Sequence, residues 1–146
     1  MSDASLEAAF HLLVVLILPQ WMLMLLAPGR SLTHRMLASP WSVVPPAMAY
    51  AVIVLPQLGE LLPLLLRPTP DALADYFSHP GGFMAIWSHA IALDLFVGRW
   101  VYLDAYAARR SAWVMTPTLL MVLMLAPLGL LLYLTLRAAH SRARRA

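Results

Sequence analysis

Three ionisable side chains lie within one apolar stretch of the chain, at residues 83–103. Asp94 stands about midway along it, with His89 five residues before and Arg99 five residues after. A charged group at the centre of a membrane-spanning helix costs about 2.5–3.5 kcal/mol, so Asp94 is expected to face protein or a cavity and to have a partner. A carboxyl group and an imidazole in such a place could serve a substrate as general acid and base.

The helical positions of these side chains limit which of them can meet. Positions five apart differ by about 140° around a helix, so the three do not share one stripe. Polar groups on several faces predict a helix that is enclosed by protein or lines a cavity. Trp87 and Tyr102 lie closer to the Asp94 side. Gly98, one turn beyond, would let another helix or a ligand approach closely. These last three are the candidate substrate-binding residues.

Each ionisable residue also has a structural interpretation. Asp94 could be a hydrogen-bonding hub between helices. Arg99 could extend to the lipid headgroups beside Trp100, and His89 could bond a backbone carbonyl across the bundle. Asp104 is expected at the membrane interface in a structural role.

The preceding apolar stretch adds a second pair of polar residues. Gln57 and Glu60 are three apart, which places them near one helical face. Glu60 beside Gly59 is therefore another candidate acid or base. The alternative is that a kink at Pro56 ends the buried segment and leaves Glu60 in water.

Familiar cofactor and metal motifs are absent from the sequence. It has no cysteine, no phosphate-binding glycine loop and no dinucleotide fingerprint. The five histidines are scattered without an i, i+4 pair, at His11, His34, His79, His89 and His140. We therefore expect no metal site and no cofactor, and any chemistry should be redox-neutral acid–base work.

Four hydrophobic segments must position these residues: about 6–27, 41–66, 83–103 and 116–137. Each has about 20 residues, which at 1.5 Å per residue crosses a hydrocarbon layer of roughly 30 Å. The sequence thus predicts an all-α fold, an integral membrane four-helix bundle with short loops, formed by residues 1–146 as one domain.

Prolines and caps refine this prediction. The second segment should be kinked or broken near Pro56. Thr69 followed by Pro70 predicts a short surface helix through Phe77. Pro117 suits the first turn of the fourth span, and Pro127 falls inside that span.

Composition supports a membrane protein and indicates its partners. Hydrophobic residues make up 62% of the chain and charged residues only 12%, so a soluble fold could not bury so much apolar surface. All ten basic residues are arginine, and several follow the last span directly, at Arg137, Arg142, Arg144 and Arg145. Anionic lipid headgroups are the expected partner of this tail, and nucleic acid is not.

The third span resembles a known family. It reads Trp-x-His-x-x-x-x-Asp-Leu-Phe-x-x-Arg-x-x-Tyr-x-Asp, formed by Trp87, His89, Asp94, Leu95, Phe96, Arg99, Tyr102 and Asp104. With the segments at Ala27-Pro28 and 126–129, the chain is similar to the abscisic-acid-deficient-four-like family. Plant members of that family are called neoxanthin synthases.

The resemblance implies a carotenoid or related isoprenoid lipid as ligand. Because violaxanthin and neoxanthin are isomers, the plant reaction requires an acid at the epoxide oxygen and a base for a carbon-bound proton, and no cofactor in principle. Asp94 is then the first candidate, with Glu60 or His89 as counterpart and Arg99 stabilising negative charge. Without a transit peptide, we expect a bacterial relative in the inner (cytoplasmic) membrane.

Two other functions stay open at this point. The chain could be a non-catalytic carotenoid- or lipid-binding accessory to a pathway enzyme, and it could self-associate. It could instead be a small transporter in which Asp94 and Glu60 form a proton-linked relay.

Overall fold

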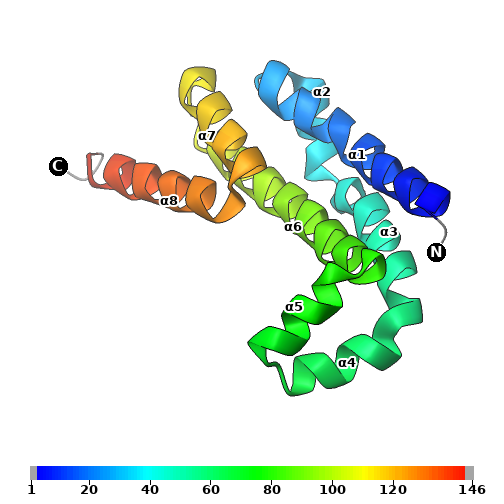
Figure 1. Cartoon of the computed structure of the whole chain (residues 1–146). Coiled ribbons are helices and arrows are strands. Elements are labelled where there is room, and N and C mark those ends of the chain that lie inside the picture. The colour runs from blue at the N-terminus through cyan, green and yellow to red at the C-terminus, as the bar shows by residue number, and fades with distance from the viewer. Residues whose placement is uncertain (1–2, 144–146) are drawn as a thin grey trace. The chain divides into compact units, whose positions relative to one another are not determined.

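The computed structural model describes residues 3–143, with side chains from Ser5 to His140, and this part of the chain is helical without a strand. Its helices, shown in Figure 1, are α1 (Asp3–Leu26), α2 (Ser31–Ala38), η1 (Pro40–Val43), α3 (Val44–Val54), η2 (Leu55–Gln57), α4 (Leu58–Leu66), α5 (Pro70–Ser78), α6 (Pro80–Ala107), α7 (Ala112–Met124) and α8 (Ala126–Ala143). Of the basic tail, Arg144 and Arg145 lie outside the described residues, as does the side chain of Arg142.

Three helical segments are long and apolar enough to cross a membrane, at Ser5–Leu26, Pro40–Leu66 and Pro80–Ala107. They coincide with the first three predicted spans and mark the chain as a membrane protein. The third is the most enclosed: 39% of its apolar window is buried within the protein, against 17% and 11% for the first and second. This helix is therefore the least exposed of the three.

The segment expected as a fourth span, 116–137, is divided between two helices. Helix α7 ends at Met124, because Leu125 leaves the helical conformation with φ −148° and ψ 68°. Pro127 lacks an N–H, and its ring clashes with a carbonyl of the preceding turn, which explains the break. Gly129 allows the first turn of α8 to lie close to α7, because a Cβ at this position would collide with the backbone of Val122. The expected fourth span is therefore not one continuous helix.

Helix α7 also begins earlier than its sequence suggested. Ser111 caps it, with Oγ accepting a hydrogen bond from the backbone N–H of Trp113 at 3.3 Å. Pro117 consequently lies inside the helix and not in its first turn. The expectation that the helix would begin near Thr116 is therefore wrong by about one turn.

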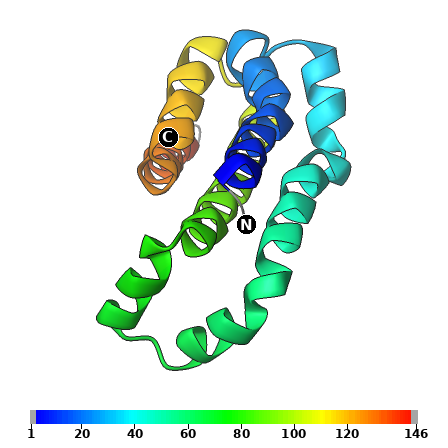
Figure 2. The same cartoon turned by 45° about the vertical axis from the view of Figure 1, so that its right-hand side comes forward.

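The other local predictions are confirmed. A 3-10 turn at Leu55–Gln57 interrupts the second span at Pro56. Helix α5 begins after Thr69, whose side chain accepts a hydrogen bond from the N–H of Ala72 at 3.3 Å. Helices α4 and α5 leave the loop at residues 67–69 as the two arms of a hairpin (Figures 1 and 2).

The chain forms two compact units, and each is considered by itself. Unit 1 comprises the residues up to Ile17 with Val43–Leu93, and unit 2 comprises Leu18–Ser42 with the residues from Asp94 onward. Helices α1 and α6 contribute to both.

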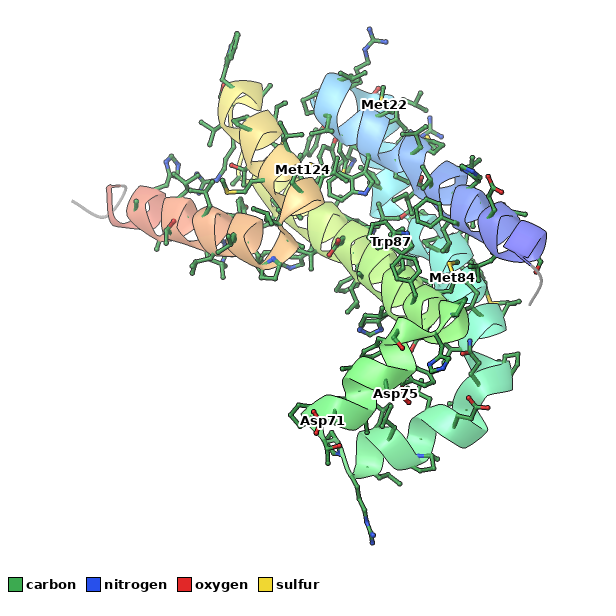
Figure 3. The ribbon with its side chains drawn as sticks, viewed as in Figure 1. Met22, Asp71, Asp75, Met84, Trp87 and Met124 are labelled. Carbon is green, nitrogen blue, oxygen red and sulfur yellow. The ribbon has the colours of Figure 1, made fainter. Side chains whose placement is uncertain are left out.

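The core of unit 1 has two hydrophobic clusters. In the first, Phe10 and Leu13 of α1 pack with Met84 and Ile91 of α6; Figure 3 labels Met84 on α6. In the second, Val54, Leu61 and Ala85 are buried and Tyr50 and Tyr76 pack around them. The buried hydroxyl of Ser88 is satisfied, since it donates to the carbonyl of Met84 at 2.7 Å.

The core of unit 2 gathers around the second half of α6. Buried residues come from α1, α2, α6, α7 and α8, among them Trp21, Met24, Leu37, Leu95, Val101, Tyr102, Leu119 and Tyr133. A Cβ at Gly98 would collide with the Trp21 indole, lying 3.0 Å from its Cζ2 and Cζ3. Gly98 thus allows α1 to approach α6 closely in unit 2, as expected from a residue without a side chain.

Candidate functional site

Unit 1 contains an apolar pocket with two polar side chains. It has a volume of about 150 Å³ and is lined by Tyr50, Leu61, Leu65, Phe77, Ala85, Ile86 and His89. The rings of Tyr50 and His89 lie 5.4 Å apart with a tilt of 56°. His89 is exposed, and within unit 1 no hydrogen bond to a described residue fixes its imidazole. Its nitrogens are therefore open to a ligand.

Glu60 lies on a second cavity of unit 1. This cavity has a volume of about 490 Å³, and among its lining residues are Gln57, Glu60, Asp75, Tyr76 and His79. Gln57 and Glu60 both line this cavity. Glu60 is exposed and follows the 3-10 turn that contains Pro56. Whether it lies in water or lipid stays a prediction.

Tyr76 connects the helices around this second cavity. Its hydroxyl donates to Oε1 of Gln57 at 3.2 Å. Burial raises the pKa of the Tyr76 phenol, and the nearby Glu60 and Tyr50 raise it further. The phenol therefore stays protonated and keeps its donor role. Gly82 lies against the carbonyl of Tyr76 so closely that a Cβ would collide with it.

Trp87 belongs to an aromatic stack on unit 1. Its ring stacks on Phe10 at 5.6 Å and on Phe83 at 6.1 Å, with interplanar angles of 16° and 11°. Trp87 is partly exposed, and Figure 3 labels it on α6. An exposed aromatic face of this kind could contact a flat apolar ligand.

Asp94 begins the second stretch of unit 2. It is half-buried, and no described residue of its own unit donates a hydrogen bond to it or forms an ion pair with it. The partner expected for this carboxyl is thus not found in unit 2, and its assignment as acid or base stays a prediction.

Arg99 is engaged with backbone carbonyls. Its Nε donates to the carbonyl of Leu37 at 2.6 Å and its Nη2 to that of Ala38 at 3.1 Å. These carbonyls belong to the last turn of α2, where helical partners are missing. The guanidinium therefore caps α2.

Two further residues of α6 have structural contacts in unit 2. The buried hydroxyl of Tyr102 donates to the carbonyl of Pro28 at 2.9 Å, which joins α6 to the turn after α1. Asp104 accepts a hydrogen bond from the Tyr133 hydroxyl and forms an ion pair with Arg137, with 2.9 Å between Oδ2 and Nε. The structural role expected for Asp104 is confirmed.

The sequence did not indicate Tyr50, the other polar residue of the His89 pocket. Tyr50 comes from α3, and its pairing with His89 depends on how α3 packs beside α6. A hydroxyl-bearing side chain in an apolar span was the available signal. Among the described residues, no group of three or more histidine or acidic side chains could hold a metal ion.

Comparison with known proteins identifies one relationship. The model of the family described as ABA DEFICIENT 4-like matches residues 8–133, a range that holds every candidate residue named above. Neither the curated proteins nor the solved structures give a match.

Proposed function

The chain belongs to the ABA DEFICIENT 4-like family, and on this premise we propose that it isomerises a carotenoid or a related isoprenoid lipid within a membrane. The proposed chemistry is acid–base catalysis: one proton is delivered to a substrate oxygen and another is removed from carbon. The two transfers balance, so no cofactor is needed.

The observation that carries this proposal is the pairing of His89 with Tyr50 in an apolar pocket. Leucine, isoleucine and phenylalanine side chains suit an isoprenoid, and an imidazole can either donate or accept a proton. Tyr50 would donate a hydrogen bond to the reacting oxygen while His89 transfers a proton. At about 150 Å³ the pocket would hold one end group of a long polyene, and not the whole molecule.

The other candidates have separate proposed roles. Asp94 is proposed as a further proton-transfer group, because placing a carboxyl group on a membrane helix is costly. Glu60 is its alternative. Arg99 is proposed to stabilise developing negative charge, although its contacts with α2 favour a positioning role. Trp87 would contact the polyene, and Gly98 and Tyr102 would shape the space along α6.

We further propose the cellular setting. The segment of α7 and α8 would provide a fourth crossing and complete a four-helix bundle. The membrane would be the bacterial inner membrane, and association with a second copy or a pathway enzyme would deliver the substrate.

The experiment that tests the proposal is pigment analysis in a host that makes the candidate epoxy-carotenoid and expresses this chain. Wild type should produce an isomer of the substrate. His89→Gln should lower product by about 10²–10⁴-fold at normal membrane abundance. His11→Gln is the matched control, since His11 is exposed on α1 and its contact is with Glu7 at 3.7 Å.

The alternatives give different results. Purified protein that carries pigment and never converts it would indicate a binding accessory. Solute flux into liposomes that depends on pH would indicate a transporter. Equal product from wild type and His89→Gln would remove the His89 pocket from the mechanism.

A further inference from the structure

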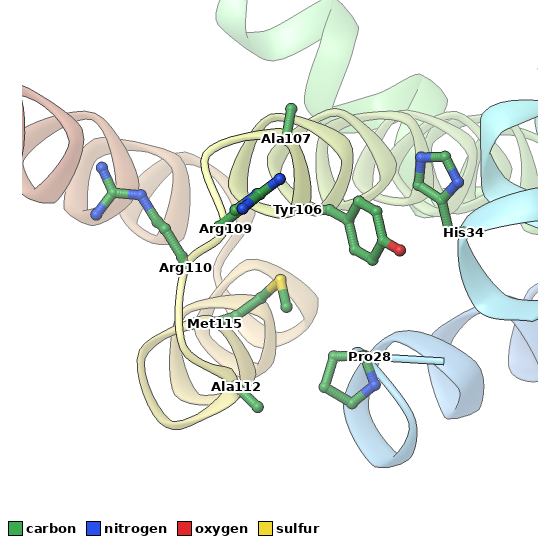
Figure 4. Close-up of a pocket in the computed structure, with 9 residues that line it drawn as sticks. Pro28, His34, Tyr106, Ala107, Arg109, Arg110, Ala112 and Met115 are labelled. Carbon is green, nitrogen blue, oxygen red and sulfur yellow. The ribbon is translucent and has the colours of Figure 1, made fainter. Parts of the chain in front are cut away.

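A basic pocket lies in unit 2 between the turn after α1 and the turn after α6. Its volume is about 560 Å³, and residues that line it include Pro28, His34, Tyr106, Arg109, Arg110 and Met115 (Figure 4). No acidic side chain is part of this lining. The pocket is therefore electropositive and suits an anion.

Several contacts fix the walls of this basic pocket. The rings of His34 and Tyr106 stack at 4.3 Å with an angle of 24°. The guanidinium carbon of Arg110 lies 5.8 Å from the centroid of the Tyr133 ring. Arg109, by contrast, is exposed and has no such contact among the described residues of unit 2, so its side chain is available to a ligand.

Arg109 occupies a backbone position that favours glycine. Its φ is 51°, and it is the one non-glycine residue with positive φ among the described residues. It lies just after the end of α6, in a turn in which the N–H of Arg110 donates to the carbonyl of Ala105 at 3.0 Å. Glycine normally fills this left-handed position after a helix, because it has no Cβ. An arginine held there against that preference points to a use for its side chain.

An apolar groove adjoins the basic pocket. It has a volume of about 530 Å³ and is lined by residues of α1 and α7 that include Leu25, Leu26, Trp113, Pro117 and Leu120. Pro28 and Ala112 line both the groove and the basic pocket, so the two are neighbours. Trp113 is 90% exposed, as is typical of an aromatic residue at the level of lipid headgroups.

We propose that the pocket and the groove together bind one anionic membrane lipid. Its phosphate would lie between Arg109 and His34, and one acyl chain would follow Leu25 and Leu120. A basic pocket beside an apolar groove matches the two parts of such an amphiphile in charge and polarity. This site is separate from the His89 pocket and does not depend on the proposed isomerisation.

The test measures lipid retention by native mass spectrometry of the purified full chain, with phosphatidic acid as probe and phosphatidylcholine of the same acyl chains as reference. Arg109→Gly should retain phosphatidic acid about five- to tenfold less than wild type, the effect of one arginine near an anionic group. Arg35→Gln is the control, because it removes one charge from an exposed position on α2. It should change retention less than about twofold.

The choice of glycine separates binding from folding. Arg109→Gly relieves the backbone preference and should melt at the same or a higher temperature than wild type. Lower retention together with unchanged thermal stability supports the site, and unchanged retention overturns it.

Two further arms identify the ligand. Leu120→Trp, a change at an exposed position of the groove, should lower lipid retention by blocking the acyl chain. Inorganic phosphate at the concentration of the lipid should not displace it. If phosphate displaces the lipid and Leu120→Trp binds normally, the pocket is a site for free phosphate and the lipid proposal is wrong.

Discussion

The two halves of α6 carry similar polar residues in very different surroundings. In unit 1, His89 faces Tyr50 across an apolar pocket without a hydrogen bond that fixes its ring. In unit 2, Arg99 and Tyr102 donate to backbone carbonyls at 2.6 Å and 2.9 Å. Asp104 is likewise occupied by Tyr133 and Arg137.

This contrast explains how one membrane helix can combine chemistry with stability. Carbonyls at the end of α2 and in the turn after α1 lack helical partners, and leaving such groups unsatisfied in an apolar setting costs several kcal/mol. Arg99 and Tyr102 supply donors to them. A polar residue whose hydrogen-bonding groups are already used in this way is less available to a substrate than His89.

Asp94 is half-buried and has neither a pocket contact like that of His89 nor hydrogen bonds like those of Arg99 and Tyr102 among the described residues of unit 2. Its replacement has the largest expected effect. Asp94→Asn keeps the size and most of the hydrogen-bonding capacity but removes the ionisable group. If Asp94 transfers a proton, product should fall by about 10²–10⁴-fold while membrane abundance stays normal. Pigment composition and immunodetection in the same membranes measure both. Normal product at normal abundance would transfer the role to Glu60.

The sequence predicted those features that depend on neighbouring residues. The Thr69 cap, the interruption at Pro56 and the enclosure of α6 follow from short-range rules of capping, proline geometry and membrane polarity. The sequence did not predict that Ser111 would start α7 early or that the chain would turn sharply before Pro127. Both depend on which of several compatible caps and breaks the packing selects.

The candidate site was less predictable, for a tertiary reason. Helical periodicity placed His89 and Asp94 on different faces of α6, but it contained no information on α3, which supplies Tyr50. It likewise gave no indication that Arg99 would meet Leu37, which is 62 positions away in the chain. A sequence shows which ionisable residues lie in a span. The residues that contact them are determined by how the helices pack.

Tyr102→Phe should separate stability from chemistry. The change leaves the carbonyl of Pro28 without its donor and should lower the free energy of unfolding by about 1–3 kcal/mol. Tyr50→Phe removes a hydroxyl from a pocket wall and should instead lower product with little change in stability. Thermal unfolding in detergent and pigment analysis of both variants measure the two effects. The reverse result would break the contrast between the units.

Gly98→Ala tests the close approach of α1 and α6 in unit 2. A Cβ would collide with the buried indole of Trp21, so the core must shift, which typically costs about 1–3 kcal/mol. Gly59→Ala is the control, because no atom lies within 4 Å of a Cβ placed there. On α4 this change should stabilise the helix by about 0.5–1 kcal/mol. Equal melting temperatures for the two variants would contradict the packing argument.

The smallest expected effect is the pH response of Tyr76 in unit 1. Its pKa is raised above the ordinary value of 10.0, first by burial and then by Glu60 and Tyr50. The folded chain therefore holds this proton more tightly than the unfolded chain, so the stabilisation is complete below pH 10.0 and is lost as the pH rises through the raised value. Glu60→Gln removes the second cause and should move the midpoint of the Tyr76 tyrosinate absorbance slightly downward, whereas burial keeps it above the ordinary value. Subtracting the titration of Tyr76→Phe isolates this phenol from the other tyrosines. An unchanged midpoint in Glu60→Gln would show that the carboxylate does not act on Tyr76 across the cavity they share.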